Sequence, residues 1–245
     1  MYYRKLVSVA VALVLAFSAL LVASATPKEK RASEPTLQAI EPLDLAILIQ
    51  DDLVPQVSNE IGVTRDFIRS LPQGSNVMVG YITAGTLQVR QPFTSDLEKA
   101  ARSLRIPTAS IGSAPFNPYV EVLEALRKFD SDSASRNANA ILLISDGLDT
   151  SRGFDSTAAG HTIDIERAIS EANKRHVAVF SFYAPSVGLT SRNRIAASYG
   201  QSSLNRLSNE TGGRAFFQGA TGFVTFDSYF SRLRETLNRQ YARVR

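Results

Sequence analysis

The side chains best suited to chemistry are acids that directly follow short apolar runs. They are Asp51 and Asp52 after the run Ala46–Ile49, and Asp146 and Asp149 after the run Ala140–Ile144. If both runs are parallel strands, their carboxyl ends meet at one edge of a sheet, where open α/β folds bind ligands. Carboxylates gathered there repel one another and raise each other's pKa unless a cation or an arginine intervenes. The spacing therefore predicts either a weak cation site or an edge neutralised by arginine, for which Arg152 is the local candidate.

The same acids also have a purely structural interpretation. Asp is common at strand ends, where its side chain caps the next helix or tightens a turn. The pair Asp146-Gly147 fits such a turn. On this interpretation the acids affect stability alone, and the chain is a structural domain with no ligand of its own.

Other common kinds of functional site find no support in the sequence. The 245 residues include no Cys and two His, His161 and His176, so neither thiol catalysis nor a transition-metal site is predicted. The sequence has no G-x-G-x-x-G and no G-x-x-x-x-G-K-[ST], the glycine-rich motifs that cradle phosphates. It also has no G-x-S-x-G nucleophile motif. We therefore expect no catalytic residues and no bound organic cofactor.

The charge balance argues against nucleic acid as a partner. The chain has 27 Lys and Arg against 23 Asp and Glu, a net charge of +4. Two of the positive charges, Arg4 and Lys5, lie in a segment that we expect to be removed, which leaves 25 minus 23, or +2. The basic residues do not gather on one predicted face, so no nucleic-acid binding is expected.

The first 25 residues have the three parts of a secretory signal. Arg4 and Lys5 are followed by the uncharged apolar run Leu6–Ala23 and then by the small-residue site Ala23-Ser24-Ala25. This pattern predicts cleavage after Ala25 and a secreted or periplasmic protein. An uncleaved anchor is the alternative, because the run is long enough to cross a bilayer. Retention of this segment is the only membrane association that we expect.

After the signal, the sequence predicts a tether and one domain. Residues 26–43 are largely polar and charged, with three prolines, and are predicted to form a short tether. Residues 44–245 are enough for one sizeable hydrophobic core, so a single domain is the expectation.

Within that domain, predicted strands alternate with predicted helices. Strands are predicted at Ala46–Ile49, Val77–Ile82, Thr86–Phe93, Ala140–Ile144, Val177–Tyr183 and Ala215–Phe217. Helices are predicted over Val57–Leu71, from a capping box at Ser95–Glu98, from Asn117, from Thr162, around Leu204–Leu207, and over Phe226–Val244. This alternation predicts a doubly wound, mostly parallel Rossmann-like α/β sheet with helices on both faces and one antiparallel edge strand.

One connection is long enough to suggest a function. The stretch Pro185–Gly200 is rich in Ser, Arg and Asn and is predicted to be irregular. It contains Arg192 and Arg194 and follows the carboxyl end of a predicted strand. Long connections at such positions are often functional, so this stretch is a predicted contact surface.

Two segments resemble the von Willebrand factor type A (VWA) domain. Residues Ala140–Gly147 are similar to the strand-then-Asp-Gly signature of that family. Residues Thr211–Phe217, preceded by Leu204–Leu207, resemble the late helix-to-strand turn of its bacterial members. The order of elements from Asp44 to Arg245 also fits the domain. The resemblance implies a VWA-like fold and a module that binds a partner protein through a divalent cation held at the strand tips.

The cation motif of that family is incomplete in this sequence. Its Asp-x-Ser-x-Ser pattern falls on Gln50, Asp52 and Val54, its loop Thr falls near Ser113, and its second Asp falls on Asp146. The resemblance therefore implies a metal site of Asp52, Asp146 and Ser113. A hard cation such as Mg²⁺ prefers anionic or strongly polar oxygen, whereas Gln50 offers a neutral carbonyl and Val54 offers nothing. The implied site is degenerate, and a weakly bound Mg²⁺ or other divalent cation is the only cofactor considered.

The favoured hypothesis is an exported, non-catalytic VWA-like module that binds an unknown protein through its strand-tip face. The loops after Ile49, Ile144 and Tyr183 would make the contacts. An alternative is a Mg²⁺-dependent phosphatase-like hydrolase that uses Asp51 or Asp52 with Asp146. Against it, no Lys or glycine-rich loop is placed to cradle a phosphate. The structural domain without a ligand is the third hypothesis.

Overall fold

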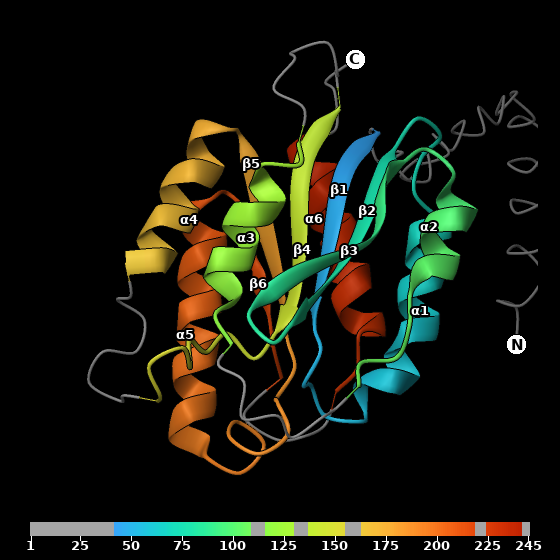
Figure 1. The fold of residues 1–245 in the computed structure, drawn as a ribbon. Coiled ribbons are helices and arrows are strands. Elements are labelled where there is room, and N and C mark those ends of the chain that lie inside the picture. Colours follow the sequence, from blue (N-terminus) through green and yellow to red (C-terminus); the bar gives the residue numbers. More distant parts are fainter. Residues whose placement is uncertain (1–41, 109–115, 130–136, 155–162, 219–223, 242–245) are drawn as a thin grey trace, which may run out of the picture. The chain divides into compact units, whose positions relative to one another are not determined.

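In a computed structural model of the protein, the described residues are 42–108, 116–129, 137–154, 163–218 and 224–241 (Figure 1). The predicted signal at 1–25 lies outside these ranges, as does the predicted tether apart from its last two residues. Ser113 and His161 also lie outside them. No helix among the described residues combines the length and the apolar character needed to cross a bilayer.

A six-stranded sheet forms the centre of the domain. Its strands are β1 (Leu43–Gln50), β2 (Asn76–Thr83), β3 (Thr86–Thr94), β4 (Ala138–Ser145), β5 (Val177–Tyr183) and β6 (Ala215–Phe216). Their order across the sheet is β3-β2-β1-β4-β5-β6, and β3 alone runs antiparallel to its neighbour. The doubly wound, mostly parallel sheet with one antiparallel edge strand is therefore confirmed.

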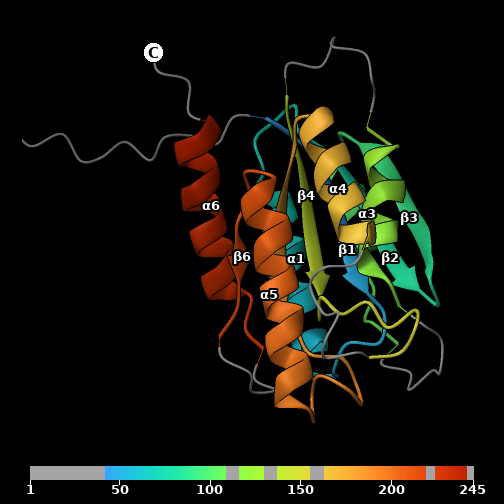
Figure 2. The same ribbon diagram turned by 90° about the vertical axis from the view of Figure 1, so that its left-hand side faces the viewer.

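Helices cover both faces of this sheet (Figures 1 and 2). They are α1 (Val57–Arg69), α2 (Leu97–Ser103), α3 (Pro118–Leu126), α4 (Ile163–Lys174), α5 (Arg194–Glu210) and α6 (Asp227–Tyr241). One hydrophobic core lies between the sheet and α1, α2 and α6, and a second lies between the sheet and α3, α4 and α5. The two cores share the strands because successive side chains of a strand point to opposite faces.

Local sequence explains why these elements form where they do. Every residue of β5 is buried, as expected for a strand covered on both faces, where an almost continuous apolar run is required. In α1 the buried residues recur at helical spacing. Helix α3 begins as predicted, because the Asn117 side chain accepts hydrogen bonds from the backbone of Tyr119 and Val120 and a proline occupies the first turn.

Two helix starts differ from the sequence-based prediction. Helix α5 starts at Arg194, not near Leu204, so the second half of the predicted irregular stretch is helical. Its first turns bury small residues, Ala196, Ala197 and Gly200, and so lack the large apolar stripe that marks a helix. Helix α2 is capped by Asp96, which accepts from the Lys99 backbone, and not by the Ser95 of the predicted capping box.

The strand order reverses between β1 and β4, which places two tips side by side. Both strands run parallel, with Ile49 of β1 opposite Ile144 of β4. The chain leaves β1 toward β2 on one side and leaves β4 toward β5 on the other. In open α/β sheets such a switch point leaves a crevice beyond the strand ends, and the next residues, Gln50 and Ser145, lie at it.

Candidate functional site

The centre of the strand-tip edge is a buried amide between two acids. The Gln50 Nε2 atom donates to Asp52 Oδ1 at 2.7 Å and to Asp146 Oδ1 at 3.2 Å. Gln50 and Asp146 are both almost fully buried, at 1% and 2% relative exposure. The sequence prediction that Gln50, Asp52 and Asp146 lie together at one edge of the sheet therefore agrees with the geometry.

The hydrogen bonds on the other side of the amide fix its orientation. Gln50 Oε1 accepts from the Ser145 hydroxyl at 2.5 Å and from the backbone N–H of Asp146 at 3.3 Å. A backbone N–H can only donate, so the atom that faces it must be the oxygen. The amide nitrogen is thereby held toward the two carboxylates, and the carbonyl oxygen points away from them.

Burial changes the acid–base properties of both carboxyl groups. Loss of solvent is the largest cause that raises the pKa of Asp52, and the nearby charge of Asp146 adds to it, while the hydrogen bond from Gln50 acts in the opposite direction; the net result is a pKa of about 7. Burial also raises the pKa of Asp146, although the backbone of Leu148 and the Thr190 hydroxyl donate to it at 3.0 and 3.3 Å. Both acids therefore favour the neutral form more than an exposed carboxyl does.

Asp51 points away from this cluster and is neutralised by an arginine. Arg105 donates to it through both terminal nitrogens, at 2.6 and 2.8 Å, and the Thr108 backbone and the Thr83 hydroxyl each donate at 2.9 Å. Burial on its own would raise the pKa of Asp51, but these hydrogen bonds outweigh it and hold the pKa below its ordinary value. The guanidinium also lies 4.0 Å from the centroid of the Tyr81 ring.

The neutralising arginine is thus Arg105, whereas the sequence favoured Arg152. Arg152 is exposed and forms no ion pair with any residue that the structure describes. Asp149 also stays out of the cluster, because its Oδ1 accepts from the backbone N–H and the hydroxyl of Ser151. Only two of the four predicted acids, Asp52 and Asp146, are brought together.

The remaining positions implied for a cation give little support to one. Val54 is buried in the hydrophobic core beside the sheet, and its backbone N–H donates to Pro185 at 2.9 Å. Ser113 lies outside the described residues. No group of three His or acidic side chains within the described ranges is arranged to hold a metal. Because the Gln50 nitrogen, and not an oxygen, faces the two carboxylates, this arrangement does not fit a resident divalent cation.

The loop after β5 completes the site. The sequence predicted this loop as a contact surface but did not single out Ser186 or Thr190 within it. The Val187 backbone N–H donates to the carbonyl of Asp52 at 2.8 Å, and Leu53 forms an isolated antiparallel β-bridge with Ser186. Thr190 accepts from the Ser186 backbone at 2.6 Å and donates to Asp146. The available signal was the pair of hydroxyl residues, Ser186 and Thr190, directly after the carboxyl end of a buried strand.

Two glycines hold α5 close to the site. A Cβ atom on Gly200 would lie 1.9 Å from the carbonyl oxygen of Asp146, and one on Gly147 would lie 2.3 Å from that of Gly200. Gly147 also has a φ of +72°, which side chains other than glycine rarely adopt. The loop after β4 and the first half of α5 therefore touch through their backbones.

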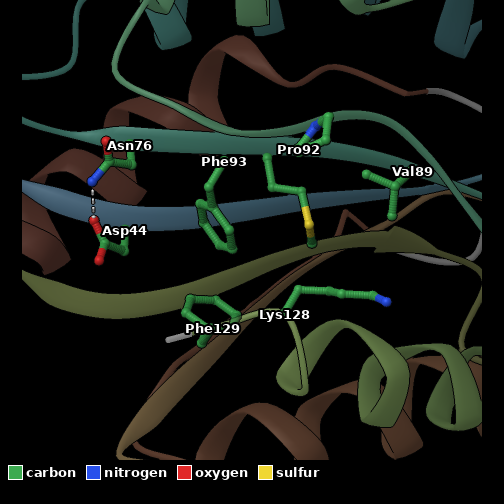
Figure 3. Close-up of a pocket in the computed structure, with 8 residues that line it drawn as sticks. Asp44, Asn76, Val89, Pro92, Phe93, Lys128 and Phe129 are labelled. Atoms are coloured by element: carbon green, nitrogen blue, oxygen red, sulfur yellow. Dashed lines mark hydrogen bonds between the residues drawn. The ribbon is translucent and has the colours of Figure 1, made fainter. Parts of the chain in front are cut away.

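Another concave feature lies at the opposite edge of the sheet. A pocket of about 570 Å³ opens beside β3 and the end of α3 (Figure 3). It is lined by Asp44, Asn76, Met78, Val89, Pro92, Phe93, Lys128 and Phe129. Asp44, the one carboxylate among its described lining residues, accepts from the amides of Asn76 and Asn137, each at 2.8 Å. The acid serves local structure, so we place the candidate site at the strand tips.

Comparison with known proteins identifies the fold. No protein-family model matches the sequence, and no curated protein matches it. Solved structures do match. The chain is similar over 80% of its length to an aerotolerance-related membrane protein from Bacteroides fragilis, with a TM-score of 0.53, 15% identity and 99% of that chain covered. It is also similar over 80% of its length to a von Willebrand factor type A protein from Catenulispora acidiphila, with a TM-score of 0.50, 14% identity and 43% of that chain covered.

The chain has a VWA fold. BatB from Bacteroides thetaiotaomicron is a further match, with a TM-score of 0.55 and 14% identity over 80% of this chain and 98% of that chain. At these identities the likeness establishes the VWA fold alone. The chemistry of the strand tips must be argued from the residues that this chain carries there.

Proposed function

We propose that this chain is an exported, non-catalytic VWA module that binds a partner protein through its strand-tip face, at a degenerate adhesion site. The observation that carries the proposal is the Gln50 amide, which donates to Asp52 and Asp146 at 2.7 and 3.2 Å. An amide N–H₂ between two carboxyl groups supplies the partial positive charge that a cation would otherwise provide. The partner is then bound by direct polar contacts and needs no ion bridge.

The burial of the two acids supports a role in holding the face together. Neutral or half-neutral carboxyl groups with raised pKa values lose less by staying out of water than ionised ones. Through Asp52 and Asp146 the tip of β1, the tip of β4 and the loop after β5 are joined by hydrogen bonds. The face is therefore a pre-organised surface, which lowers the entropic cost of binding.

The same geometry argues against the hydrolase alternative. A phosphoryl-transfer nucleophile must reach its substrate, but Asp146 is 2% exposed and Asp51 is held by Arg105. Asp52 is the one acid with partial access, and it is shielded by Gln50. With p-nitrophenyl phosphate and Mg²⁺ as the probe, we expect no turnover above that of the Asp52→Asn variant. Turnover that this change abolishes would favour the hydrolase.

Export belongs to the proposal and rests on the three-part pattern of residues 1–25. Fractionation of cells that make the full chain tests it. We expect the protein outside the cytoplasmic membrane and shorter than the translated sequence by the predicted signal. A full-length product in the cytoplasm would contradict this part of the proposal.

Site-specific photocrosslinking tests the binding function. A photoreactive amino acid replaces Gln56, which is exposed just beyond β1, or Lys128, which is exposed beside the pocket at the opposite edge. We expect a discrete protein adduct from position 56 only, equally strong in EDTA and in Mg²⁺. Equal labelling from both positions, no adduct from position 56, or an adduct that requires Mg²⁺ would overturn the proposal.

A further inference from the structure

Three arginines on the strand-tip face have no acidic partner within the described part of the chain. They are Arg152, in the loop after β4, and Arg192 and Arg194, at the end of the loop after β5 and the start of α5. All three are exposed, and none forms an ion pair or a side-chain hydrogen bond with a residue that the structure describes. Elsewhere in the domain arginines commonly hold carboxylates, as Arg69 holds Glu98 at 2.7 Å and Arg206 holds Glu166 at 2.6 Å.

An apolar strip lies beside these arginines on α5. Ile195 is 61% exposed, one of the most exposed large apolar side chains of the described residues. Tyr199 follows four positions later and so lies on the same face of the helix. The ring of Phe154 lies 6.1 Å from that of Tyr199, and both rings are half-buried. The strip therefore runs from the loop after β4 to the first turn of α5.

The two segments that carry the arginines lie side by side. In Figures 1 and 2 the loop that follows β4 runs along the first half of α5. The backbone contact between Gly147 and Gly200 and the ring contact between Phe154 and Tyr199 hold them there. The arginines and the apolar strip thus form one surface, which we call the arginine patch: Arg152, Phe154, Arg192, Arg194, Ile195 and Tyr199.

Among the residues that the structure describes, the acids near the patch offset its positive charge only in part. The first turn of α5 contains no acidic residue. Asp149 hydrogen-bonds with Ser151, whose donors are uncharged, so it offsets part of the positive charge. Asp146 is buried, and burial favours its neutral form. The described, exposed part of this face therefore has more arginines than acids, although the chain as a whole is nearly balanced in charge.

We propose that the arginine patch docks a protein segment in which an apolar side chain is flanked by Asp or Glu. The inference rests on the proposed function and adds the chemistry of the partner. Guanidinium groups bind carboxylates through two parallel hydrogen bonds, and exposed arginines that surround a small apolar centre match the usual composition of binding hot spots. Charge complementarity selects the acidic residues, and the strip of Ile195, Tyr199 and Phe154 receives the apolar one.

A peptide array probes this chemistry with the full chain. The peptides carry one Leu or Phe flanked at varied spacing by Asp and Glu, by Asn and Gln, or by Lys. We expect binding to the acidic set alone, with affinity that falls as NaCl screens the charges. The combined change of Arg152, Arg192 and Arg194 to Gln is expected to weaken binding by about tenfold or more, since one charge-assisted hydrogen bond accounts for about that factor. Ile195→Ala is expected to weaken binding independently of salt.

Matched controls separate the patch from charge in general. Arg214→Gln removes an exposed arginine that directly precedes β6 and is not part of the arginine patch, and this variant is expected to bind the acidic peptides as the unchanged protein does. Equal binding of acidic and neutral peptides would overturn the inference, as would full binding by the triple variant. Binding to phosphatidylglycerol vesicles without binding to any peptide would assign the patch to a membrane and also overturn it.

The failure of this inference is distinguishable from the failure of the proposed function. If the triple variant still gives the adduct from position 56 while the acidic peptides fail to bind, the binding function stands and the arginine patch is wrong. If no adduct forms from position 56 in the unchanged protein, the binding function itself is wrong.

Discussion

Two adjacent acids at the tip of β1 meet opposite environments. Asp51 is held by the guanidinium of Arg105, and its pKa is lowered despite burial. Asp52, the next residue, faces the Gln50 amide and the carboxyl of Asp146, and its pKa is raised to about 7. A full positive charge stabilises a buried carboxylate, whereas an amide dipole leaves it close to neutral. The comparison shows that the groups opposite each acid, and not its place in the sequence, decide its ionisation.

The first test of this comparison replaces the amide of Gln50, which faces Asp52. Gln50→Glu keeps the length of the side chain and places a third carboxyl group among buried acids. Because an uncompensated buried charge is costly, we expect a loss of about 4 kcal/mol in the free energy of unfolding at pH 8, measured by urea titration. The loss should shrink at pH 5, where the acids are protonated.

Divalent cations give this variant a second readout. Mg²⁺ at millimolar concentration is expected to restore part of the stability of Gln50→Glu, because a cation then replaces the lost amide dipole. The unchanged protein should show neither stabilisation nor heat of binding under the same conditions. Strong Mg²⁺ binding by the unchanged protein would mean that the Gln50 amide does not fill the position of an ion.

The second test removes the Arg105 guanidinium, which faces Asp51 as the Gln50 amide faces Asp52. Arg105→Gln leaves the Asp51 carboxylate, which is 4% exposed, without its charged partner. We expect a loss of about 3 kcal/mol at pH 7, somewhat less than for Gln50→Glu because the Arg105 side chain is itself 26% exposed. Arg102→Gln, on an exposed helix position, serves as the control and should stay within about 0.5 kcal/mol. Equal effects of the two changes would refute a structural role for the Asp51–Arg105 pair.

The raised pKa of Asp52 makes a signed prediction about pH. Its folded-state pKa of about 7 lies above the ordinary value of 3.8, so between these values the folded state binds more protons than the unfolded state. Stability should therefore fall as the pH rises from about 4 to about 7 and then level off. Between pH 5 and pH 8, we expect the free energy of unfolding of the Asp52→Asn variant to decrease by about 2 kcal/mol less than that of the unchanged protein. Thermal or urea unfolding at several pH values checks it, and parallel pH curves for the two proteins would contradict it.

The sequence predicts the sheet well because its strands have strong local signals. The run Ala140–Ile144 and the segment Val177–Tyr183 are apolar enough to be identified as buried strands without any tertiary information. Which strand tips adjoin was implied by the resemblance to the VWA domain and not by the alternation of elements. The convergence of Gln50, Asp52 and Asp146 follows from the strand order that this resemblance implies. Helix α5 shows the limit, since the small side chains that let its first turns approach Asp146 carry no apolar periodicity.

The partners of the acids were harder to predict than their positions. Arg105 is 54 residues from Asp51 in the sequence, and the two meet only because the β2–β3 hairpin and α2 return the chain to the tip of β1. Arg152 was the nearer choice along the chain, yet it remains exposed. Proximity in sequence is a weak guide to ion pairing, because the choice of partner depends on side-chain direction at the end of a long connection.

Asp149 supplies the smallest and sharpest test of the comparison. It was expected to join the acidic cluster, but its Oδ1 accepts from the backbone and hydroxyl of Ser151, a local turn. Asp149→Asn keeps an acceptor at that position, so we expect a change within about 0.5 kcal/mol in the free energy of unfolding and no shift in the pH dependence assigned to Asp52. If the stability of Asp149→Asn instead fell with a pH midpoint lower than that of the unchanged protein, Asp149 would be coupled to Asp52. The edge would then hold a cluster of three interacting acids, and a single amide would no longer account for its stability.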